Sequence, residues 1–202
     1  MPNSRDMIFG CVLMGGQSRR FGGADKSQLR IGEATLLDHV IIGARDQVER
    51  LALGASQNGL HHDASSGLPV LNDEYEQIGP MAGLHAAMKW AQPDAGFIAT
   101  FACDTPSFPA DMVEQLSQAA QVEKADVALP RHNGRIHTAL GLWSTKLLPQ
   151  LIRAIDANQL ALTRWALDMG AVLVDFDGGP QQNFFNINSP QDAEHYRSLT
   201  GV

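Results

Sequence analysis

A stretch rich in glycine and positive charge stands near the start of the chain, between Leu13 and Lys26. Its glycines and cations are Gly15, Gly16, Arg19, Arg20, Gly22, Gly23 and Lys26. Glycine lets backbone N–H groups approach phosphate oxygens because it has no Cβ in the way. Arginine and lysine add charge-assisted hydrogen bonds to the same oxygens, each worth about 1.5–3 kcal/mol. The stretch is therefore predicted to hold the phosphates of a nucleotide, in preference to forming a solvated surface loop.

The spacing within this stretch excludes two common phosphate-binding motifs. A Walker loop has glycine directly before its lysine, whereas Asp25 precedes Lys26 here. The dinucleotide motif G-x-G-x-x-G is missing too, since Gly15 and Gly16 are adjacent and the next glycine is Gly22. A nucleotide site of another kind is expected.

Asp104 is the carboxylate best placed for chemistry, because it follows the almost wholly apolar run 97–103. A buried strand would hold it at the edge of a sheet, where α/β proteins bind their ligands. There it is predicted to bind Mg²⁺, which takes one or two carboxylates together with phosphate oxygens and water. The alternative is a turn with Thr105 and Pro106, in which aspartate is also common. The metal site is preferred because a triphosphate needs a neutralising cation.

Further candidates stand where other strands or helices are expected to end or begin. Asp73 follows a short apolar run, and it either contacts a base or ribose or lies in a solvated loop. Gly83 belongs to the segment 79–84, whose glycines serve close approach to a ligand or tight packing of a helix on a sheet. Asn186 and Asn188 alternate with apolar residues, so their amides either point together at a ligand or form turns before the last helix.

Apolar runs and helical stripes alternate along the chain and predict the elements that position these residues. Strands are expected at residues 7–13, 51–53, 69–71, 97–103, 125–130, 138–143 and 171–174. Helices are expected at residues 35–50, 80–90, 109–120, 145–157 and 160–169, with a last helix capped by Ser189. Strands separated by helices pair in parallel through crossovers. The fold class is therefore α/β, with a mostly parallel central sheet in a single domain spanning residues 1–202.

The composition is that of an ordinary globular protein, with 44% hydrophobic and 18% charged residues. The formal net charge of −7 argues against a general nucleic-acid binder, which needs a broad basic surface. The two cysteines, Cys11 and Cys103, are too few for a disulfide scaffold or a four-cysteine zinc site, and both are expected to be buried. No apolar stretch has the length of a signal peptide or a membrane span. A cytoplasmic protein without a membrane partner is expected.

Four short motifs follow one another in an order that is similar to one protein family. They are Leu13-x-Gly15-Gly16-x-Ser18-x-Arg20-x-Gly22-Gly23-x-Asp25-Lys26, Gly79-Pro80-x-Ala82-Gly83, Cys103-Asp104-Thr105-Pro106 and Phe185-Asn186-Ile187-Asn188-Ser189-Pro190. With these motifs the chain resembles the molybdenum cofactor guanylyltransferases, from the first expected strand to the last helix. The resemblance implies a three-layer Rossmann-like nucleotidyltransferase fold. It also implies transfer of GMP from GTP to molybdopterin carrying molybdenum, with release of pyrophosphate.

Carried over position by position, the resemblance implies a substrate site built from residues along the whole chain, namely Leu13, Met14, Gly15, Lys26, Gly54, Asp73, Asp104, Asn186 and Asn188. The residue types and their spacing add Gly16, Arg19, Gly22 and Gly83 to the residues expected to bind substrate. Catalysis is expected from Lys26 on the phosphates, from Asp104 as the Mg²⁺ ligand, and from Arg20. Asn186 and Asn188 are expected to lie towards the molybdopterin.

Two positions depart from the pattern of the family. Met14 replaces the usual small alanine of the first motif, and it either crowds the base or fills a gap. Gly54 stands where the family has a base-contacting asparagine, and glycine has no side chain with which to read guanine. The choice between GTP and CTP therefore stays open at this point, although the type of reaction does not.

The resemblance implies GTP and molybdenum-carrying molybdopterin as substrates, together with proteins that supply the cofactor and deliver the product to molybdoenzymes. Three alternative functions remain. The chain is a cytidylyltransferase of the same cofactor, a nucleotidyltransferase acting on a sugar phosphate, or a non-catalytic module that senses a nucleotide. Intact Lys26 and Asp104 argue against the last of these.

Overall fold

The computed structural model describes residues 7–14, 26–55, 67–75 and 78–201. The described chain forms β1 (Ile8–Leu13), η2 (Lys26–Gln28), β2 (Arg30–Ile31), β3 (Ala34–Thr35), α1 (Leu36–Arg45), β4 (Arg50–Ala55), β5 (Val70–Asn72), α2 (Pro80–Ala91), β6 (Phe97–Ala102), α3 (Met112–Glu123), β7 (Val127–His132), β8 (Arg135–Ile136), η4 (Thr138–Leu140), β9 (Leu142–Ser144), η5 (Thr145–Leu147), α4 (Leu148–Asp156), α5 (Leu162–Asp168), β10 (Val172–Asp175) and α6 (Pro190–Thr200). The elements labelled η are short 3₁₀ helices.

The central sheet has the strand order β10-β7-β9-β6-β1-β4-β5, with β8 paired to β7. The pairs β1–β4, β1–β6, β4–β5 and β10–β7 are parallel, whereas β9 runs antiparallel to both β6 and β7. The expected mostly parallel sheet is thus confirmed. Because β1 and β6 lie in its middle, whatever follows their carboxyl ends lies at the centre of one sheet edge.

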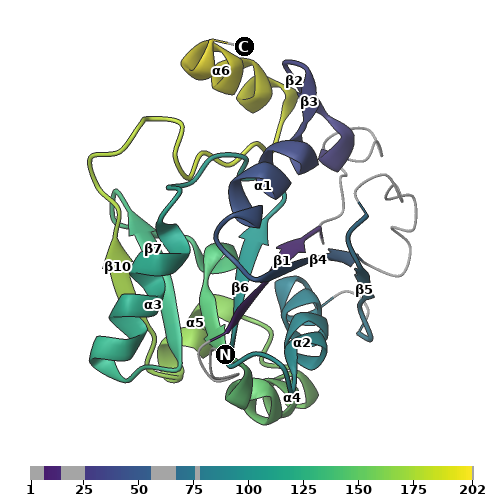
Figure 1. The fold of residues 1–202 in the computed structure, drawn as a ribbon, viewed down its shortest axis with the longest axis vertical. Coiled ribbons are helices and arrows are strands. Elements are labelled where there is room, and N and C mark those ends of the chain that lie inside the picture. The colour runs from purple at the N-terminus through teal and green to yellow at the C-terminus, as the bar shows by residue number, and fades with distance from the viewer. Residues whose placement is uncertain (1–6, 15–25, 56–66, 76–77, 202) are drawn as a thin grey trace.

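Helices cover both faces of this sheet, so the expected three layers are present (Figure 1). Alternate residues of β1 point to opposite faces. Cys11 and Leu13 pack in one hydrophobic cluster with residues of α2, α4 and α5. Val12 packs in a second cluster with residues of α1 and α3. Apolar burial on both faces is what the continuous apolar runs of β1 and β6 predict.

The last helix, α6, covers a separate small cluster away from the two main ones. Ile31 of β2 and Leu36 of α1 pack there against Ile187, Ala193 and Tyr196. Figure 1 shows α6 beside the β2–β3 hairpin. The segment that follows the glycine-rich stretch is thereby joined to the segment that carries Asn186 and Asn188.

Several expected elements differ in their bounds, and two of these differences have a clear physical reason. The strand expected at residues 138–143 comprises only β9, because residues 138–140 form η4 instead, closed by a hydrogen bond from the Leu140 N–H to the His137 carbonyl. The helix expected at residues 35–50 ends at Arg45. The chain must turn there because the Glu49 N–H already donates to the Ile8 carbonyl at the start of the β1–β4 pairing.

The expectation that both cysteines are buried holds fully for Cys11 and only in part for Cys103. Cys11 is wholly buried in β1, and burial raises the pKa of its thiol to about 12. Cys103, directly after β6, is only partly buried. Of the helices in the described part of the chain, none is both long enough and apolar enough to cross a lipid bilayer.

Candidate active site

The carboxyl ends of β1, β4, β5 and β6 meet at one edge of the sheet. Leu13 pairs in register with Gly54 on one side and with Ala102 on the other. The Cys103 N–H donates to the Leu13 carbonyl at 3.2 Å, and the Asp73 N–H donates to the Ala55 carbonyl at 3.1 Å. The residues that follow these strands are therefore gathered at a single edge, as the fold class requires for a ligand site.

An ion pair between Lys26 and Asp104 stands at the centre of this edge. The ammonium nitrogen Nζ of Lys26 lies 3.2 Å from Oδ2 of Asp104, although 78 residues separate them in the chain. Lys26 opens η2, and Asp104 follows β6. The two side chains are 18% and 32% exposed, so the pair is accessible to a ligand while partly screened from water.

The second carboxylate oxygen of Asp104 is held by neighbours from two segments. The Asn186 amide nitrogen Nδ2 donates to Oδ1 of Asp104 at 3.1 Å, and the Thr105 hydroxyl donates to the same oxygen at 3.3 Å. The Ile187 N–H donates to the Asp104 carbonyl at 2.8 Å. These bonds fix the carboxylate in one orientation, which a side chain that binds a charged ligand needs.

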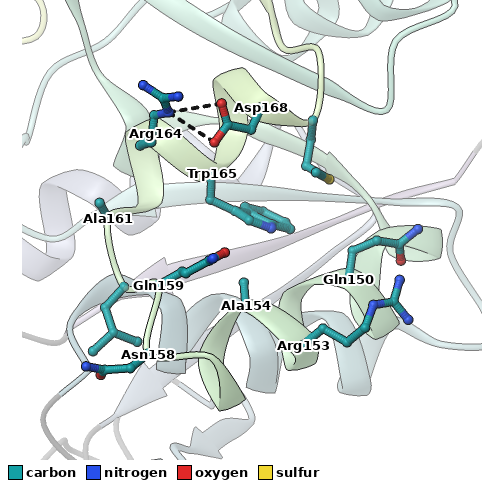
Figure 2. Close-up of a pocket in the computed structure, with 11 residues that line it drawn as sticks. Gln150, Arg153, Ala154, Asn158, Gln159, Ala161, Arg164, Trp165 and Asp168 are labelled. Carbon is teal, nitrogen blue, oxygen red and sulfur yellow. Dashed lines mark hydrogen bonds and ion pairs between the residues drawn. The ribbon is translucent and has the colours of Figure 1, made fainter.

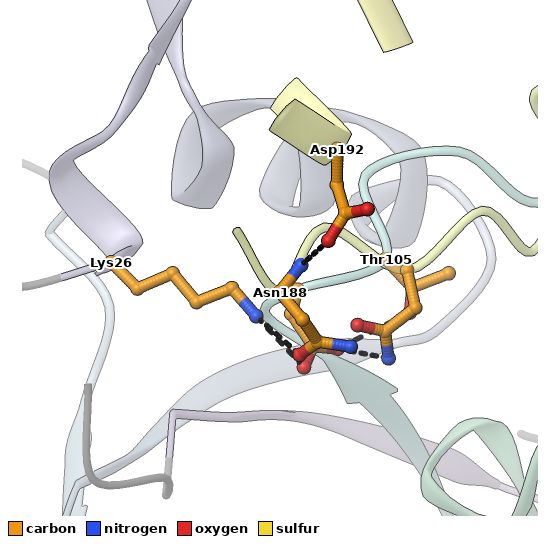
Figure 3. A network of polar contacts seen from close by, with 6 residues as sticks. Lys26, Thr105, Asn188 and Asp192 are labelled. Atoms are coloured by element: carbon orange, nitrogen blue, oxygen red, sulfur yellow. Dashed lines mark hydrogen bonds and ion pairs between the residues drawn. The ribbon is translucent and has the colours of Figure 1, made fainter. Parts of the chain in front are cut away.

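Asn188 completes the cluster from the start of α6. Its Oδ1 accepts a hydrogen bond from Nζ of Lys26 at 3.0 Å, and Figure 3 shows the lysine extended towards it. The Asn188 N–H donates to Oδ2 of Asp192 at 2.8 Å, while the Asp192 N–H donates to the Ser189 hydroxyl at 3.2 Å. The bond from Asn188 is the main cause that lowers the pKa of Asp192. This reciprocal cap fixes the place of Asn188.

A second group of candidate residues gathers around Leu13, on the α2 side of the same edge. Gly83 packs so closely that a Cβ on it would lie 2.9 Å from Cδ2 of Leu13 and 3.9 Å from Oδ1 of Asp73. Tight packing of helix on sheet is thus one use of this glycine. Asp73 is 8% exposed, and burial raises the pKa of its carboxyl group to about 6. This group lies beside the Lys26–Asp104 pair, because the Cys103 N–H, one residue before Asp104, donates to the Leu13 carbonyl.

The structure shows what surrounds Gly54 and Met14, the two positions that depart from the family pattern. A Cβ on Gly54 would lie 3.2 Å from Sγ of Cys11, so a side chain there would press on the core unless Cys11 shifted. The Met14 N–H donates to the Gly54 carbonyl at 3.0 Å, and the Met14 side chain packs against the hydrophobic cluster on the α1 face. Met14 therefore fills space on the core side of the edge.

Part of the expected site lies outside the described residues. Gly15, Gly16, Arg19, Arg20 and Gly22 belong to this part, so their expected contacts with phosphates stay predictions. The described candidates fall into the two neighbouring groups above, which contain Leu13, Met14, Lys26, Gly54, Asp73, Gly83, Asp104, Asn186 and Asn188.

The donor atoms around Asp104 suit a hard cation. Within the described ranges, no three histidine, cysteine, aspartate or glutamate side chains come together as a metal cage. The available oxygens are the Asp104 carboxylate and the amide oxygens of Asn186 and Asn188. Oδ1 of Asn186 is buried and accepts no hydrogen bond. A single carboxylate with few neutral oxygens fits Mg²⁺, which keeps waters and takes substrate phosphates as its other ligands.

A cavity lies away from this edge, between α4 and α5. It has a volume of about 630 Å³ and is lined by Ala154, Trp165 and Arg164, among others (Figure 2). Arg164 is paired there with Asp168 at 3.0 Å. None of the candidate residues lines this cavity. The edge that holds Lys26 and Asp104 is therefore the better candidate for chemistry.

Known proteins share this arrangement of elements along most of the chain. The family model described as a MobA-like NTP transferase domain matches residues 10–168. The chain belongs to this family. The matched span contains Lys26, Asp73 and Asp104, while Asn186 and Asn188 lie beyond it.

Relatives with a stated activity match nearly the whole chain. A molybdenum cofactor guanylyltransferase of Cereibacter sphaeroides is 35% identical over 95% of this chain and 96% of its own length. One from Mesorhizobium japonicum is 36% identical, with 92% of each chain covered. The crystal structure of molybdopterin-guanine dinucleotide biosynthesis protein A from Archaeoglobus fulgidus has a TM-score of 0.79 at 21% identity and covers 96% of this chain and 98% of its own. This family member therefore has the nucleotidyltransferase fold that its sequence predicts.

Sequence reasoning missed two residues that hold the cluster together, Thr105 and Asp192. Thr105 is read more easily as part of a turn before proline, and its bond to Asp104 depends on the fold. Asp192 had a local signal, because serine followed three residues later by an acidic residue is typical of a capped helix start. Its bond to Asn188 follows from that motif.

Proposed function

We propose that this chain transfers GMP from GTP to molybdopterin carrying molybdenum and releases pyrophosphate. The observation that carries the proposal is the accessible pair of Lys26 and Asp104, with Nζ and Oδ2 3.2 Å apart at the edge where the strands end. Relatives named for this activity share about a third of the sequence over nearly the whole chain. The pair offers one cationic and one anionic group to the same ligand, as a triphosphate with a metal requires.

We assign Mg²⁺ to Asp104, with the amide oxygens of Asn186 and Asn188 as further neutral donors beside it. When bound, the ion would neutralise the crowded phosphate oxygens and act as a Lewis acid on the phosphorus that is attacked. Lys26, which pairs with Asp104 in the absence of substrate, supplies three N–H donors to the phosphates once the carboxylate has another partner. The hydrogen bonds to Oδ1 of Asp104 keep the carboxylate oriented through this exchange.

The reaction is an in-line displacement at the α-phosphorus of GTP. A phosphate oxygen of molybdopterin forms the new P–O bond, and the bond to the leaving pyrophosphate breaks. This chemistry asks for position and charge neutralisation rather than for a covalent intermediate on the protein. Lys26 stabilises the negative charge of the phosphates, and Asn188 holds the lysine at the edge. Asn186 and Asn188 face the incoming molybdopterin, and Arg19, Arg20 and the glycines of residues 15–22 complete the phosphate site.

We infer that Asp73 selects the base, since Gly54 has no side chain. Burial raises the pKa of Asp73 to about 6, so its carboxyl group is mostly ionised at pH 7. A carboxylate accepts hydrogen bonds only, and guanine offers two adjacent groups of N–H donors on one edge. Leu13 and Gly83, which pack beside Asp73, would form the apolar wall of the base site.

We place the reaction in the cytoplasm, with proteins that hand over molybdopterin and receive the product. The support is the lability of molybdopterin, which favours direct transfer between proteins. GTP as a substrate fits the same compartment.

The decisive experiment measures pyrophosphate release from GTP, CTP, ATP and UTP, each with and without molybdenum-loaded molybdopterin. We expect release with GTP only when the acceptor is present, and a loss of about 100-fold in the Lys26→Ala variant, in the range found when one charge-stabilising group is removed. A preference for CTP would identify a cytidylyltransferase instead. Release only with a sugar phosphate as acceptor would contradict the molybdopterin assignment, and no release with any acceptor would indicate a nucleotide-sensing module.

A further inference from the structure

Phe184 adopts a backbone conformation that bulky residues rarely take. Among the described residues other than glycine, φ is positive at Lys124, Asn133, Asn158 and Phe184, with a value of 59° for the phenylalanine. Lys124 caps the carboxyl end of α3, and asparagine tolerates this conformation well. Phe184 is instead the third residue of a turn closed by a bond from the Phe185 N–H to the Gln182 carbonyl. Positive φ at that position normally selects glycine.

The ring of Phe184 is clamped by three other rings. It lies 5.4 Å from the ring of His132, 4.9 Å from that of His137 and 5.6 Å from that of Phe176, as measured between centroids. These residues come from β7, from the segment after β8 and from the segment after β10. The Phe184 N–H also donates to the Ser107 carbonyl at 2.9 Å, and the side chain is only 3% exposed. The surroundings therefore overdetermine the place of this residue.

The two histidine rings that contact Phe184 are each held in a defined state. Burial, together with the nearby charge of Arg135, lowers the pKa of His137 to about 4, so its imidazole is neutral near pH 7. His132 is tied by a contact of 2.9 Å between its Nδ1 and the Phe176 carbonyl. The clamp thus joins β7, the segment after β8 and the segment after β10 to the start of the segment 184–188.

The segment 184–188 alternates anchors with polar side chains that reach the Lys26–Asp104 pair. Its buried anchors are Phe184 and Ile187, the second of which is wholly buried. Asn186 donates through Nδ2 to Asp104, and Asn188 accepts from Lys26. Because Oδ1 of Asn186 accepts no hydrogen bond, only one half of this amide is tied by a polar contact. Its orientation must then come from the backbone that carries it.

We propose that Phe184 is a positioning residue, whose clamped ring holds the segment 184–188 so that Asn186 and Asn188 meet Asp104 and Lys26. The ring contacts His132, His137 and Phe176 rather than the pair, so it acts through the two asparagines. Only the kinetic test of this role rests on the proposed function. The hydrogen bond between Asn186 and Asp104 can be measured without substrate.

The kinetic experiment compares Phe184→Leu, which keeps apolar volume, with Phe184→Gly, which keeps the backbone conformation. We expect both variants to lower kcat for GMP transfer about tenfold, with less than about a threefold change in the KM for GTP, in the range of coupling between contacting residues. In an Asn186→Ala background, Phe184→Leu should lower kcat by less than about twofold further. Wild-type kcat in Phe184→Gly, or equal losses in both backgrounds, would overturn the proposal.

A matched control and a second readout separate positioning from loss of stability. Phe9→Leu removes a buried ring that packs on Trp90 at the opposite end of β1, so it should lower the melting temperature while leaving kcat within about twofold. The carboxamide ¹H–¹⁵N signals of Asn186, assigned through Asn186→Ala, report the hydrogen bond to Asp104 directly. We expect them to move in Phe184→Leu and to stay in Phe9→Leu, and unmoved signals in Phe184→Leu would contradict the proposal. If the wild-type protein released no pyrophosphate, the proposed function would fail while these signals still decided the role of Phe184.

Discussion

Replacement of Asp104 by asparagine separates the chemistry of the site from its stability. The Asp104→Asn variant keeps the size of the side chain but loses the negative charge and one of the two acceptor oxygens. In the wild-type structure these oxygens accept from Lys26, Asn186 and Thr105 at 3.2, 3.1 and 3.3 Å. One amide oxygen can keep only part of this network.

The cost to stability should be small. An ion pair exposed to the extent of 18% and 32% contributes about 0–1 kcal/mol. Loss of one further hydrogen bond adds about 0.5–1.5 kcal/mol. Since 1 kcal/mol shifts the melting temperature of a domain of this size by about 2–4 °C, the variant should melt several degrees lower and stay folded at assay temperature.

The cost to the rate should be much larger. If the carboxylate holds Mg²⁺ against the phosphates, its loss removes about 3–4 kcal/mol of transition-state stabilisation, which corresponds to about 100- to 1000-fold in kcat. The assay is pyrophosphate release from GTP with molybdenum-loaded molybdopterin over a range of Mg²⁺ concentrations, together with thermal unfolding of the same samples.

A matched control comes from the same edge of the sheet. Asp175→Asn breaks the pair of Arg131 and Asp175, whose atoms lie 2.6 Å apart at the end of β10, and it should leave the rate within about twofold. Wild-type rates for Asp104→Asn at limiting Mg²⁺ would refute the metal assignment. Equal loss of rate in both variants would show that the edge responds to any change of charge.

Three further predictions concern the core beneath the site. Because burial raises the pKa of Asp73 to about 6, above its value near 4 in the unfolded chain, the contribution of this group to stability should fall as the pH rises from about 4 to 6, and Asp73→Asn should remove this contribution from the pH slope in urea titrations. A slope unchanged in the variant would show that another group titrates there. Cys11, wholly buried with a pKa of about 12, should resist iodoacetamide at pH 8 in the native protein and react after unfolding, as peptide mass mapping would show. Gly83→Ala brings a Cβ to 2.9 Å from Leu13 and should cost about 1–3 kcal/mol in urea unfolding, and a neutral result would mean that Leu13 moves freely.

Much of the fold, and the meeting of Lys26 with Asp104, could be predicted from the sequence. The apolar runs that become β1 and β6 are long and continuous, and buried parallel strands have this pattern. Asp104 follows one such run directly, and Lys26 ends the glycine-rich stretch that comes after the other, so the rule that ligands bind at strand ends brings them together. The direction of β9 could not be predicted in the same way. It follows η4 without a helical crossover, and an antiparallel return is the geometry that so short a connection permits.

The parts that could not be predicted depend on contacts distant in sequence. Nothing local marks Phe184 as a residue with positive φ, since the conformation is imposed by rings from other segments. The bond between Lys26 and Asn188 depends on where α6 packs, and that packing is decided by the small cluster around Ile31 and Ile187. The substrate contacts assigned to single residues stay predictions until a nucleotide complex is measured.

The span of 162 residues between Lys26 and Asn188 has a consequence for biosynthesis. As the ribosome makes the chain, the first strand, the lysine and the aspartate emerge well before the asparagines that orient them. A nascent or prematurely terminated chain that stops short of residue 186 therefore carries most of the sheet but lacks the asparagines that contact Lys26 and Asp104. If the proposed function holds, such fragments should release no pyrophosphate from GTP.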